Sequence, residues 1–298
     1  MNKLQKSGFL NPLVLLIFFI GICFSIFLFR FTHNNIETAK DHEVKDLVAR
    51  NTASIQRELD LNLQVLQALK SFYDSSKYVN RDEFKEFVTN SLSKHKSIQA
   101  LEWIPRVSQK NREQYELNAR NDLNIDFKIK NKSSEGKMVV SGAKNEYFPV
   151  YYVEPLAGNT KALGFDLASN STRQKSLNEA RDTRQIAVTA KITLIQERAK
   201  QFGFLVFVPV WKKTDKAQLK GFVLGVYRIG DMVKTALDFD EIDSSMLDIW
   251  LVDASKKEEK SLLFTNSSLN TIPTTKYISQ IIIQGRIWEM HVKPSELF

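Results

Sequence analysis

The sequence feature that most constrains this chain is an apolar run near its N-terminus. Residues 13–29 read LVLLIFFIGICFSIFLF, seventeen residues without a charged side chain. A helix of that length is about 25 Å long, close to the hydrocarbon thickness of a bilayer, and residues 9–12 can extend it. Arg30 and the polar residues after it lack the small-x-small cleavage site of a secretory signal. The run therefore predicts an uncleaved transmembrane anchor at residues 13–30, preceded by a tail at residues 1–12.

The composition excludes several classes of protein. Apolar residues make up 43% of the 298 residues, which is enough to bury the core of one or two domains. The only cysteine, Cys23, lies in the apolar run, so an intramolecular disulfide has no second partner. The four histidines are scattered, and we expect no metal and no cofactor. The net charge of +8 (42 basic minus 34 acidic residues) is spread among acidic residues, so we expect no nucleic-acid partner.

A long helix is predicted directly after the apolar run. No Pro or Gly occurs from Ile36 to Tyr73, and these 38 residues would form a helix of about 57 Å. Apolar residues recur at helical spacing, with two asparagines in the same row: Val44, Val48, Asn51, Ile55, Leu59, Asn62, Leu66 and Leu69. The helix can pack along a domain, or it can also pair with a second copy as a parallel stalk. Both interpretations remain open, and a second helix is predicted at residues 81–94.

The rest of the chain predicts antiparallel sheets. Its segments rich in Phe, Val and Tyr, punctuated by Pro and Gly, are typical of strands. We expect strands at residues 98–104, 127–129, 146–154, 162–166, 187–192, 203–211 and 221–229, with helices at 108–120, 171–183 and 231–237. A second group is expected at 248–252, 261–264, 277–284 and 286–293, where the last two flank Gly285 as a hairpin. The predicted fold class is α+β.

No catalytic motif is evident. The sequence lacks the phosphate-binding loop, the nucleophile elbow of hydrolases, the zinc-protease helix and the kinase catalytic loop, so we do not expect an enzyme. One acidic residue, Asp166, ends the apolar run at residues 162–167. Because an unpaired buried carboxylate costs several kcal/mol, it must have partners. Asp166 either caps the helix that opens at residues 170–171 or pairs with Arg173, Arg181 or Arg184. Alternatively, it is the polar anchor of an apolar ligand pocket.

Several sequence blocks, taken in order, resemble the CHASE domain. They are ALEWIPRV at 100–107, YFPVYYVEP at 147–155, LGFDL at 163–167, ARDT at 180–183, TAKITLIQE at 189–197, and GFLVF at 203–207 followed by Pro209 and Val210. The resemblance covers residues 36–292, and its motifs lie within residues 98–229.

The resemblance implies an extracytoplasmic ligand sensor of the kind carried by membrane-bound histidine kinases, diguanylate cyclases and phosphodiesterases. It implies a fold in which a transmembrane helix and a long stalk helix precede tandem PAS-like antiparallel-sheet subdomains. The expected boundaries are residues 36–96 for the stalk and connecting helices, 97–237 for the membrane-distal ligand-binding subdomain, and 238–298 for the membrane-proximal one. It also implies a single-pass protein of the inner or plasma membrane, with the residues after Arg30 in the periplasm or outside the cell.

The resemblance further implies which residues contact the ligand, a small molecule that is adenine-like in the plant receptors. The aspartate of the matching family motif hydrogen-bonds the purine, so this role falls to Asp166. Val188 and Thr189 fall on a strand that lines the pocket, and Gly225 falls on a strand that faces the ligand. We expect Asp166→Ala to abolish binding and to leave the melting temperature nearly unchanged.

The expected partners follow from the same resemblance. We expect a small-molecule ligand, the lipid bilayer around residues 13–30, and a second copy or a full-length receptor in a homodimer or heterodimer. No second membrane span or output module is evident after residue 293, so the expected output lies in a partner chain. The alternative is an accessory or truncated structural protein that dimerises through the stalk helix without binding a ligand.

Overall fold

The computed structural model describes residues 12–123, 125–194, 202–213, 215, 217–238, 246–256 and 258–295. It divides into an N-terminal unit that ends at Val48 and a C-terminal unit that begins at Ala49. The tail predicted at residues 1–12 lies outside the described residues except for Pro12. The described chain combines helices with antiparallel sheets, so the predicted α+β class is confirmed.

The described helices and strands occur in the following order. The helices are α1 (Pro12–Ser75), α2 (Arg81–Lys94), α3 (Arg112–Leu123), α4 (Ser171–Thr183) and α5 (Ile229–Asp238). The strands are β1 (Ile98–Pro105), β2 (Val107–Ser108), β3 (Lys130–Lys132), β4 (Met138–Val140), β5 (Glu146–Tyr147), β6 (Tyr152–Glu154), β7 (Ala187–Val188), β8 (Ile192–Thr193), β9 (Phe202–Trp211), β10 (Leu219–Arg228), β11 (Leu247–Asp253), β12 (Ser261–Thr265), β13 (Tyr277–Ile283) and β14 (Arg286–Pro294). Short 3₁₀ turns lie at Gln109–Asn111, Thr160–Ala162 and Leu167–Ser169.

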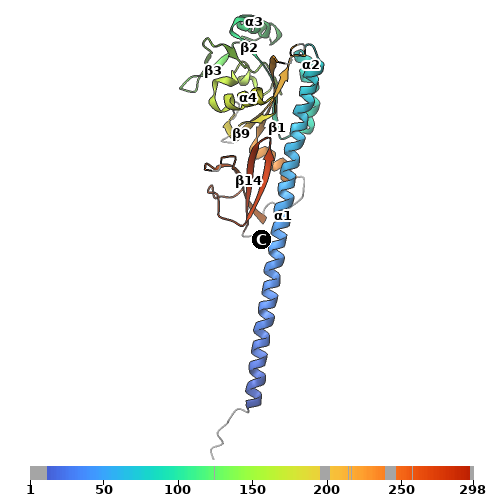
Figure 1. Cartoon of the computed structure of the whole chain (residues 1–298), viewed down its shortest axis with the longest axis vertical. Coiled ribbons are helices and arrows are strands. Elements are labelled where there is room, and N and C mark those ends of the chain that lie inside the picture. Colours follow the sequence, from blue (N-terminus) through green and yellow to red (C-terminus); the bar gives the residue numbers. More distant parts are fainter. Residues whose placement is uncertain are drawn as a thin grey trace, which may run out of the picture. The chain divides into compact units, whose positions relative to one another are not determined.

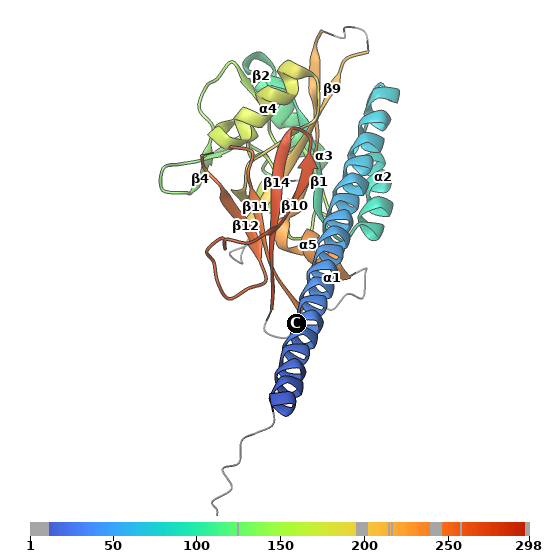
Figure 2. The ribbon, with the colours of Figure 1, turned by 60° about the horizontal axis from the view of Figure 1, so that its bottom comes forward.

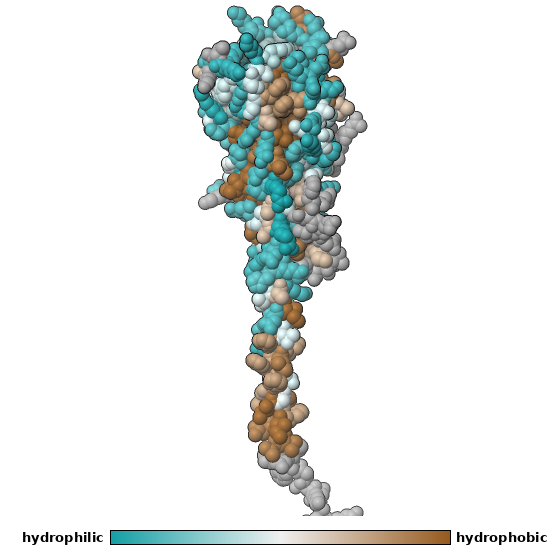
Figure 3. Space-filling model, turned by 90° about the vertical axis from the view of Figure 1, so that its right-hand side faces the viewer, coloured by the Kyte–Doolittle hydropathy of each residue, from teal (hydrophilic) through white to brown (hydrophobic). Residues whose placement is uncertain are grey.

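A single helix, α1, contains both the predicted membrane anchor and the predicted stalk. The two segments join because residues 22–75 contain no Gly or Pro to end the helix. In the N-terminal unit, the large apolar side chains between Leu13 and Phe31 are exposed and form the apolar surface seen in Figure 3. This part of α1 is long and apolar enough to cross a membrane.

In the C-terminal unit, the apolar stripe of α1 packs within its own chain. Ile55 and Leu66 are fully buried. The side-chain amide of Asn62 donates hydrogen bonds to Ser97 Oγ at 2.8 Å and to Glu58 Oε1 at 3.3 Å. This packing accounts for the stripe without a second copy, and dimerisation through α1 stays a prediction.

The larger sheet has the strand order β6-β1-β10-β9-β7, and β8 also pairs with β9. All of these pairs are antiparallel. In the register of β1 and β10, Glu102 lies opposite Leu224, and Leu101 lies opposite Gly225. Because successive side chains of a strand point to opposite faces, Glu102 and Gly225 belong to different faces of this sheet.

The two faces of the larger sheet are covered by different helices. Figure 2 shows α4 on one side of the strands and α1 on the other. On the α1 face, the Tyr227 hydroxyl donates to the Asn62 carbonyl oxygen at 3.5 Å. The α4 face carries a core of buried apolar side chains that includes Ala100, Ile104, Phe148, Phe165, Leu177, Phe207, Phe222 and Leu224. The candidate site lies on the α4 face.

The smaller sheet has the order β12-β11-β14-β13. Its strands β13 and β14 form the predicted hairpin, and Gly285 in the turn has φ of +80°, which glycine adopts readily. Gln56 of α1 bonds both backbone groups of Ile282 on β13, since its Nε2 donates to the carbonyl oxygen at 3.0 Å and its Oε1 accepts from the N–H at 2.9 Å. The two sheets follow each other along α1 in Figure 1. The boundaries predicted for two subdomains stay predictions.

Two of the predicted strands are wrong. Residues 127–129 precede β3 rather than forming a strand, and residues 162–166 form the end of a 3₁₀ turn and two isolated bridges. Gly164 has φ of +78°, which interrupts an extended strand. The strand predicted at residues 146–154 is divided into β5 and β6 around Pro149, which has no N–H to offer a ladder.

Candidate functional site

The backbone before Asp166 takes a path that requires glycine. Gly164 has φ of +78°, and a Cβ atom at this position would lie 2.2 Å from the carbonyl oxygen of Lys128. On either side of it, the N–H of Lys130 donates to the Gly164 carbonyl oxygen, and the N–H of Asp166 donates to the Lys130 carbonyl oxygen, each at 2.8 Å. These bonds fix the segment that carries Asp166 beside β3.

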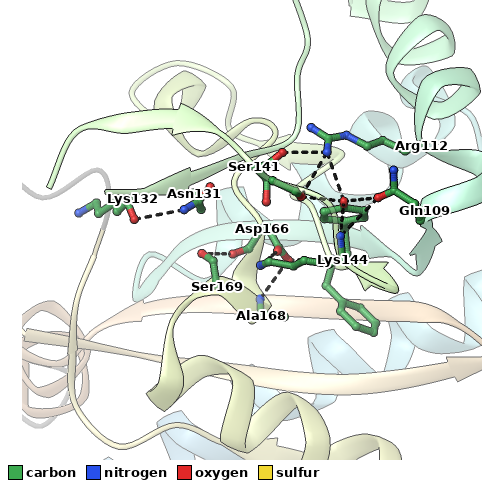
Figure 4. A network of polar contacts seen from close by, with 12 residues as sticks. Gln109, Arg112, Asn131, Lys132, Ser141, Lys144, Asp166, Ala168 and Ser169 are labelled. Atoms are coloured by element: carbon green, nitrogen blue, oxygen red, sulfur yellow. Dashed lines mark hydrogen bonds and ion pairs between the residues drawn. The ribbon is translucent and has the colours of Figure 1, made fainter. Parts of the chain in front are cut away.

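The carboxylate of Asp166 is completely buried and accepts three hydrogen bonds. Oδ1 accepts from the backbone N–H of Phe148 at 3.0 Å and from that of Ala168 at 3.2 Å, and the second bond caps the turn at residues 167–169. Oδ2 accepts from the ammonium of Lys144 at 2.7 Å. Figure 4 shows Lys144 and Ala168 beside the carboxylate. Asp166 therefore caps the turn at residues 167–169, whereas Asn170 caps α4. Its ion-pair partner is a lysine, where the sequence had suggested an arginine.

A second group of contacts holds the segment that carries Lys144. The hydroxyl of Tyr147 accepts from the Lys144 backbone N–H at 2.9 Å and from Arg112 Nη1 at 3.2 Å. The same hydroxyl lies within hydrogen-bond distance of the Gly142 carbonyl oxygen and of the Gln109 side chain. The Lys144 side chain nonetheless remains 38% exposed. Lys144 thus links a buried carboxylate to the surface of the protein.

Two further buried ionisable groups lie on the same face of the larger sheet. Glu102 of β1 is 2% exposed and Arg173 of α4 is 6% exposed, and both line a cavity of about 20 Å³ with apolar neighbours. Burial raises the pKa of Glu102 to about 8, against the opposing effect of Arg173. Arg173 donates from Nη2 to the Thr193 carbonyl oxygen at 3.1 Å, whereas its Nε has no partner among the described residues. A cavity of this size holds about one water molecule.

The sequence analysis did not predict Glu102 or Arg173 as site residues. The pattern that could have revealed Glu102 is its position between Ala100 and Ile104, because alternate residues of a strand share a face. A glutamate on the face that carries only small or apolar neighbours is a buried polar group. Arg173 was considered only as a partner of Asp166, and the structure instead places it beside Glu102.

The other predicted ligand contacts, Val188, Thr189 and Gly225, lie in or beside the larger sheet. Val188 and Thr189 are buried beside β9 and α4, where Val188 accepts at its carbonyl oxygen from Ser176 Oγ at 3.2 Å and Thr189 Oγ1 accepts from the Leu205 N–H at 3.0 Å. Gly225 lies on the α1 face, since a Cβ atom there would be 2.5 Å from the hydroxyl of Tyr227.

Val188 shares the α1 face with Gly225, because both lie in one row with Val206. The neighbouring row of Ala187 and Phe207 belongs to the core on the α4 face. The structure therefore separates Val188 and Gly225 from Asp166. Their roles and that of Thr189 as ligand contacts stay predictions. Within the described ranges, no group of three His, Cys, Asp or Glu side chains is arranged to hold a metal ion.

The architecture has a counterpart among solved structures. The fold is similar to the periplasmic sensory domain of the Campylobacter jejuni chemoreceptor Tlp1, with a TM-score of 0.50 and 13% sequence identity over 85% of this chain and 92% of that one. At this level of identity the likeness concerns the fold alone.

The family itself is defined by the sequence. The CHASE domain family matches residues 77–264, and this chain belongs to that family. CHASE is a sensor domain, which agrees with the expectation of a non-enzymatic role.

Two relatives come from Dictyostelium discoideum. Hybrid signal transduction histidine kinase A is 23% identical over 285 residues, which covers 84% of this chain and 13% of that protein. The germination-specific adenylate cyclase is 24% identical over 184 residues, which covers 59% of this chain and 20% of that protein. The chain therefore spans only a small part of the length of either relative.

Proposed function

We propose that this chain is a membrane-anchored sensor domain that binds a small molecule on the α4 face of its larger sheet. The observation that carries the proposal is the burial of three ionisable side chains, Glu102, Asp166 and Arg173, on that side of the sheet. Burying charged groups destabilises a fold unless they are compensated, and such groups concentrate at functional sites. A few polar groups in an apolar setting are also what orients a small ligand in its pocket.

The ligand we propose is an adenine-type purine or a closely related heteroaromatic molecule. Such a ring offers N–H donors to the carboxylate of Asp166, in the position that the Lys144 ammonium now takes. Lys144 is partly exposed, so it can move outward into solvent as a ligand donor takes its place at Oδ2. The cavity beside Glu102 and Arg173 is smaller than a purine, so binding on this face requires that the segment carrying Lys144 open.

We also propose that the apolar part of α1 anchors the chain in a membrane, with the C-terminal unit outside the cytoplasm. Its exposed apolar side chains support this placement, because exposing the apolar surface of a whole membrane-length helix to water is unfavourable in free energy. The larger sheet would then be the membrane-distal subdomain (97–237) and the smaller sheet the membrane-proximal one (238–298). A histidine kinase and an adenylate cyclase are the named relatives, so we propose that ligand binding controls a signalling output of that kind, within a receptor dimer.

Ligand-dependent thermal unfolding tests the binding site. The full chain in lipid nanodiscs is heated with adenine or with other purines, and we expect at least one purine to raise the Tm. The test variant is Asp166→Asn, which keeps an acceptor for Phe148 and Ala168 but cannot accept from a ligand donor at Oδ2. We expect this variant to lose the purine response. Stabilisation by no purine, or an unchanged response in the variant, would contradict the proposed site.

The single cysteine makes the topology testable. In a Cys23→Ser background, Ser93→Cys places a thiol on an exposed position of α2. A membrane-impermeant maleimide should label this thiol in intact cells, whereas a thiol introduced at Lys6 should be labelled only after lysis. The reverse pattern would place the sensor domain in the cytoplasm.

A further inference from the structure

We propose that a second cleft, on the α1 face of the larger sheet, binds a neutral, hydroxyl-rich ligand of the saccharide class. The cleft has a volume of about 580 Å³, within the usual range for small-molecule pockets. Its walls include Tyr73 of α1, Trp103 of β1, Tyr115 and Asp122 of α3, Tyr152 of β6, and Lys220 of β10. It lies across the sheet from Glu102 and Arg173, so it is independent of the site proposed above.

A buried hydroxyl without a partner points to a ligand in this cleft. Tyr73 is 3% exposed, and among the described residues its hydroxyl has no hydrogen-bond partner. Leaving such a group unpaired costs about 1–3 kcal/mol. Burial raises the pKa of Tyr73 well above its usual value, so the hydroxyl keeps its proton and can donate. The hydroxyl is closed to water in this structure, so a ligand oxygen accepts this bond once the cleft opens beside Tyr73.

The charges around the cleft favour a neutral ligand. The lining carries one carboxylate, Asp122, and one ammonium, Lys220. Two cations already occupy aromatic faces, since Lys220 Nζ lies 5.4 Å from the centre of the Tyr73 ring and Arg81 Cζ lies 5.0 Å from that of Tyr152. An organic cation would be repelled by both. The charge of Asp122 is balanced by Arg81, since its Oδ2 lies 3.8 Å from Arg81 Nε. Among the described residues of the lining, no group of like charges is therefore present to bind an ion.

The arrangement of the rings disfavours a flat aromatic ligand. Tyr73 already stacks on Trp103, with 4.0 Å between ring centres. Tyr151 meets Tyr152 and Tyr115 edge to face, at 4.9 and 5.8 Å. A planar ring would therefore have to displace a ring from its partner before it could stack.

The groups that remain available are phenol hydroxyls, the amides of Asn118 and Asn121, and the Asp122 carboxylate. These donate to and accept from hydroxyl groups, while the neighbouring ring edges contact C–H surface. A saccharide presents hydroxyls and C–H groups side by side, so its surface matches this lining.

Calorimetric titration of the full chain tests the proposal. The chain is held in lipid nanodiscs, because a maltoside detergent would itself present a saccharide. The titrants are glucose, galactose, N-acetylglucosamine, maltose and cellobiose, with choline, benzoate and adenine as ligands of other classes. We expect saturable binding of at least one saccharide. Tyr73→Phe should weaken it about threefold to tenfold, because it removes one neutral hydrogen bond.

The matched variants separate binding from folding. Tyr73→Phe removes a hydroxyl without a partner, so its Tm should equal or exceed that of the wild type. Tyr227→Phe changes a buried tyrosine outside the cleft and should leave saccharide affinity unchanged, as should Asp166→Asn at the other site. Absence of binding by every saccharide, equal affinity in Tyr73→Phe, or Tyr73-dependent binding of choline, benzoate or adenine would each overturn the proposal. If Asp166→Asn loses purine binding and keeps saccharide affinity, the result bears on the α4-face site and leaves the saccharide proposal standing.

Discussion

The ammonium of Lys144 lies 2.7 Å from Oδ2 of Asp166, so a partly exposed cation neutralises a carboxylate that has no contact with solvent. The two oxygens of this carboxylate have different partners. Oδ1 serves the backbone N–H groups of Phe148 and Ala168, and Oδ2 serves the lysine. Fold and proposed ligand binding therefore depend on different atoms of the same side chain, and variants can separate them.

Asp166→Ala should destabilise the fold as well as remove the proposed anchor. It leaves two backbone N–H groups without an acceptor, and each costs about 1–3 kcal/mol when buried. We expect urea denaturation to show a loss of about 3 kcal/mol or more in the free energy of unfolding. From the sequence alone we expected a nearly unchanged melting temperature. The two backbone contacts of Asp166 are the reason for expecting a loss of stability instead.

Asp166→Asn is the matched control for that measurement. Its remaining oxygen can still accept from Phe148 and Ala168, and only the contact with Lys144 is lost. We expect a loss of about 1 kcal/mol, because the variant also removes the cost of burying the carboxylate charge and leaves only Lys144, which reaches solvent. Equal losses in the Ala and Asn variants would show that the backbone contacts do not stabilise the turn.

Gly164→Ala should be strongly destabilising. The new Cβ would lie 2.2 Å from the Lys128 carbonyl oxygen at a φ of +78°, so both sterics and backbone conformation oppose it. Gly136→Ala is the control, since Gly136 has a nearly identical φ of +79° and no atom within 4 Å of the added Cβ. We expect a loss of about 1 kcal/mol for the control and at least about 2 kcal/mol more for Gly164→Ala, measured by urea denaturation. Similar losses at the two positions would mean that the Lys128 contact is easily relieved.

Glu102 should make stability fall as the pH rises. Burial raises its pKa from 4.5 to about 8 in the folded chain, so between these values the folded state holds a proton that the unfolded state has released. The stabilisation is complete below about pH 4.5 and is lost as the pH rises through about 8, with a slope approaching about 1.4 kcal/mol per pH unit. Urea denaturation across this range should show the decline in the wild type, and a smaller decline in Glu102→Gln. Parallel profiles would show that Glu102 titrates normally.

Gln56→Ala should loosen the edge of the smaller sheet. The side chain of Gln56 bonds both the N–H and the carbonyl oxygen of Ile282, which an edge strand otherwise leaves to solvent. We expect faster hydrogen exchange at the Ile282 amide in this variant. Gln114→Ala, which removes only a contact with Asn118 on the same helix, should leave that amide unchanged. Equal exchange in both variants would refute the role of Gln56.

The sequence by itself determined the elements whose pattern is local. The apolar run and the absence of Gly and Pro up to Ser75 predict α1, because helix formation depends on neighbouring residues and on the lack of a breaker. The helix α4 was predicted at its observed limits, residues 171–183, since Asn170 caps it and its apolar side chains follow helical spacing. The long strands β9 and β10 were also predicted from local pattern, namely segments rich in Phe, Val and Tyr that are punctuated by Gly or Pro, and the hairpin was predicted from the two segments that flank Gly285.

Only the tertiary structure decided which distant polar groups meet. Lys144 has no periodicity to connect it with Asp166, and Glu102 and Arg173 come to line one cavity only because α4 packs against β7 and β9 of the same sheet. The α4 and α1 faces likewise follow from strand register, which places Gly225 away from Asp166 although our interpretation grouped them. Charge pairing and burial depend on contacts between segments far apart in the chain. A local sequence pattern does not reveal which distant residues lie close together in space.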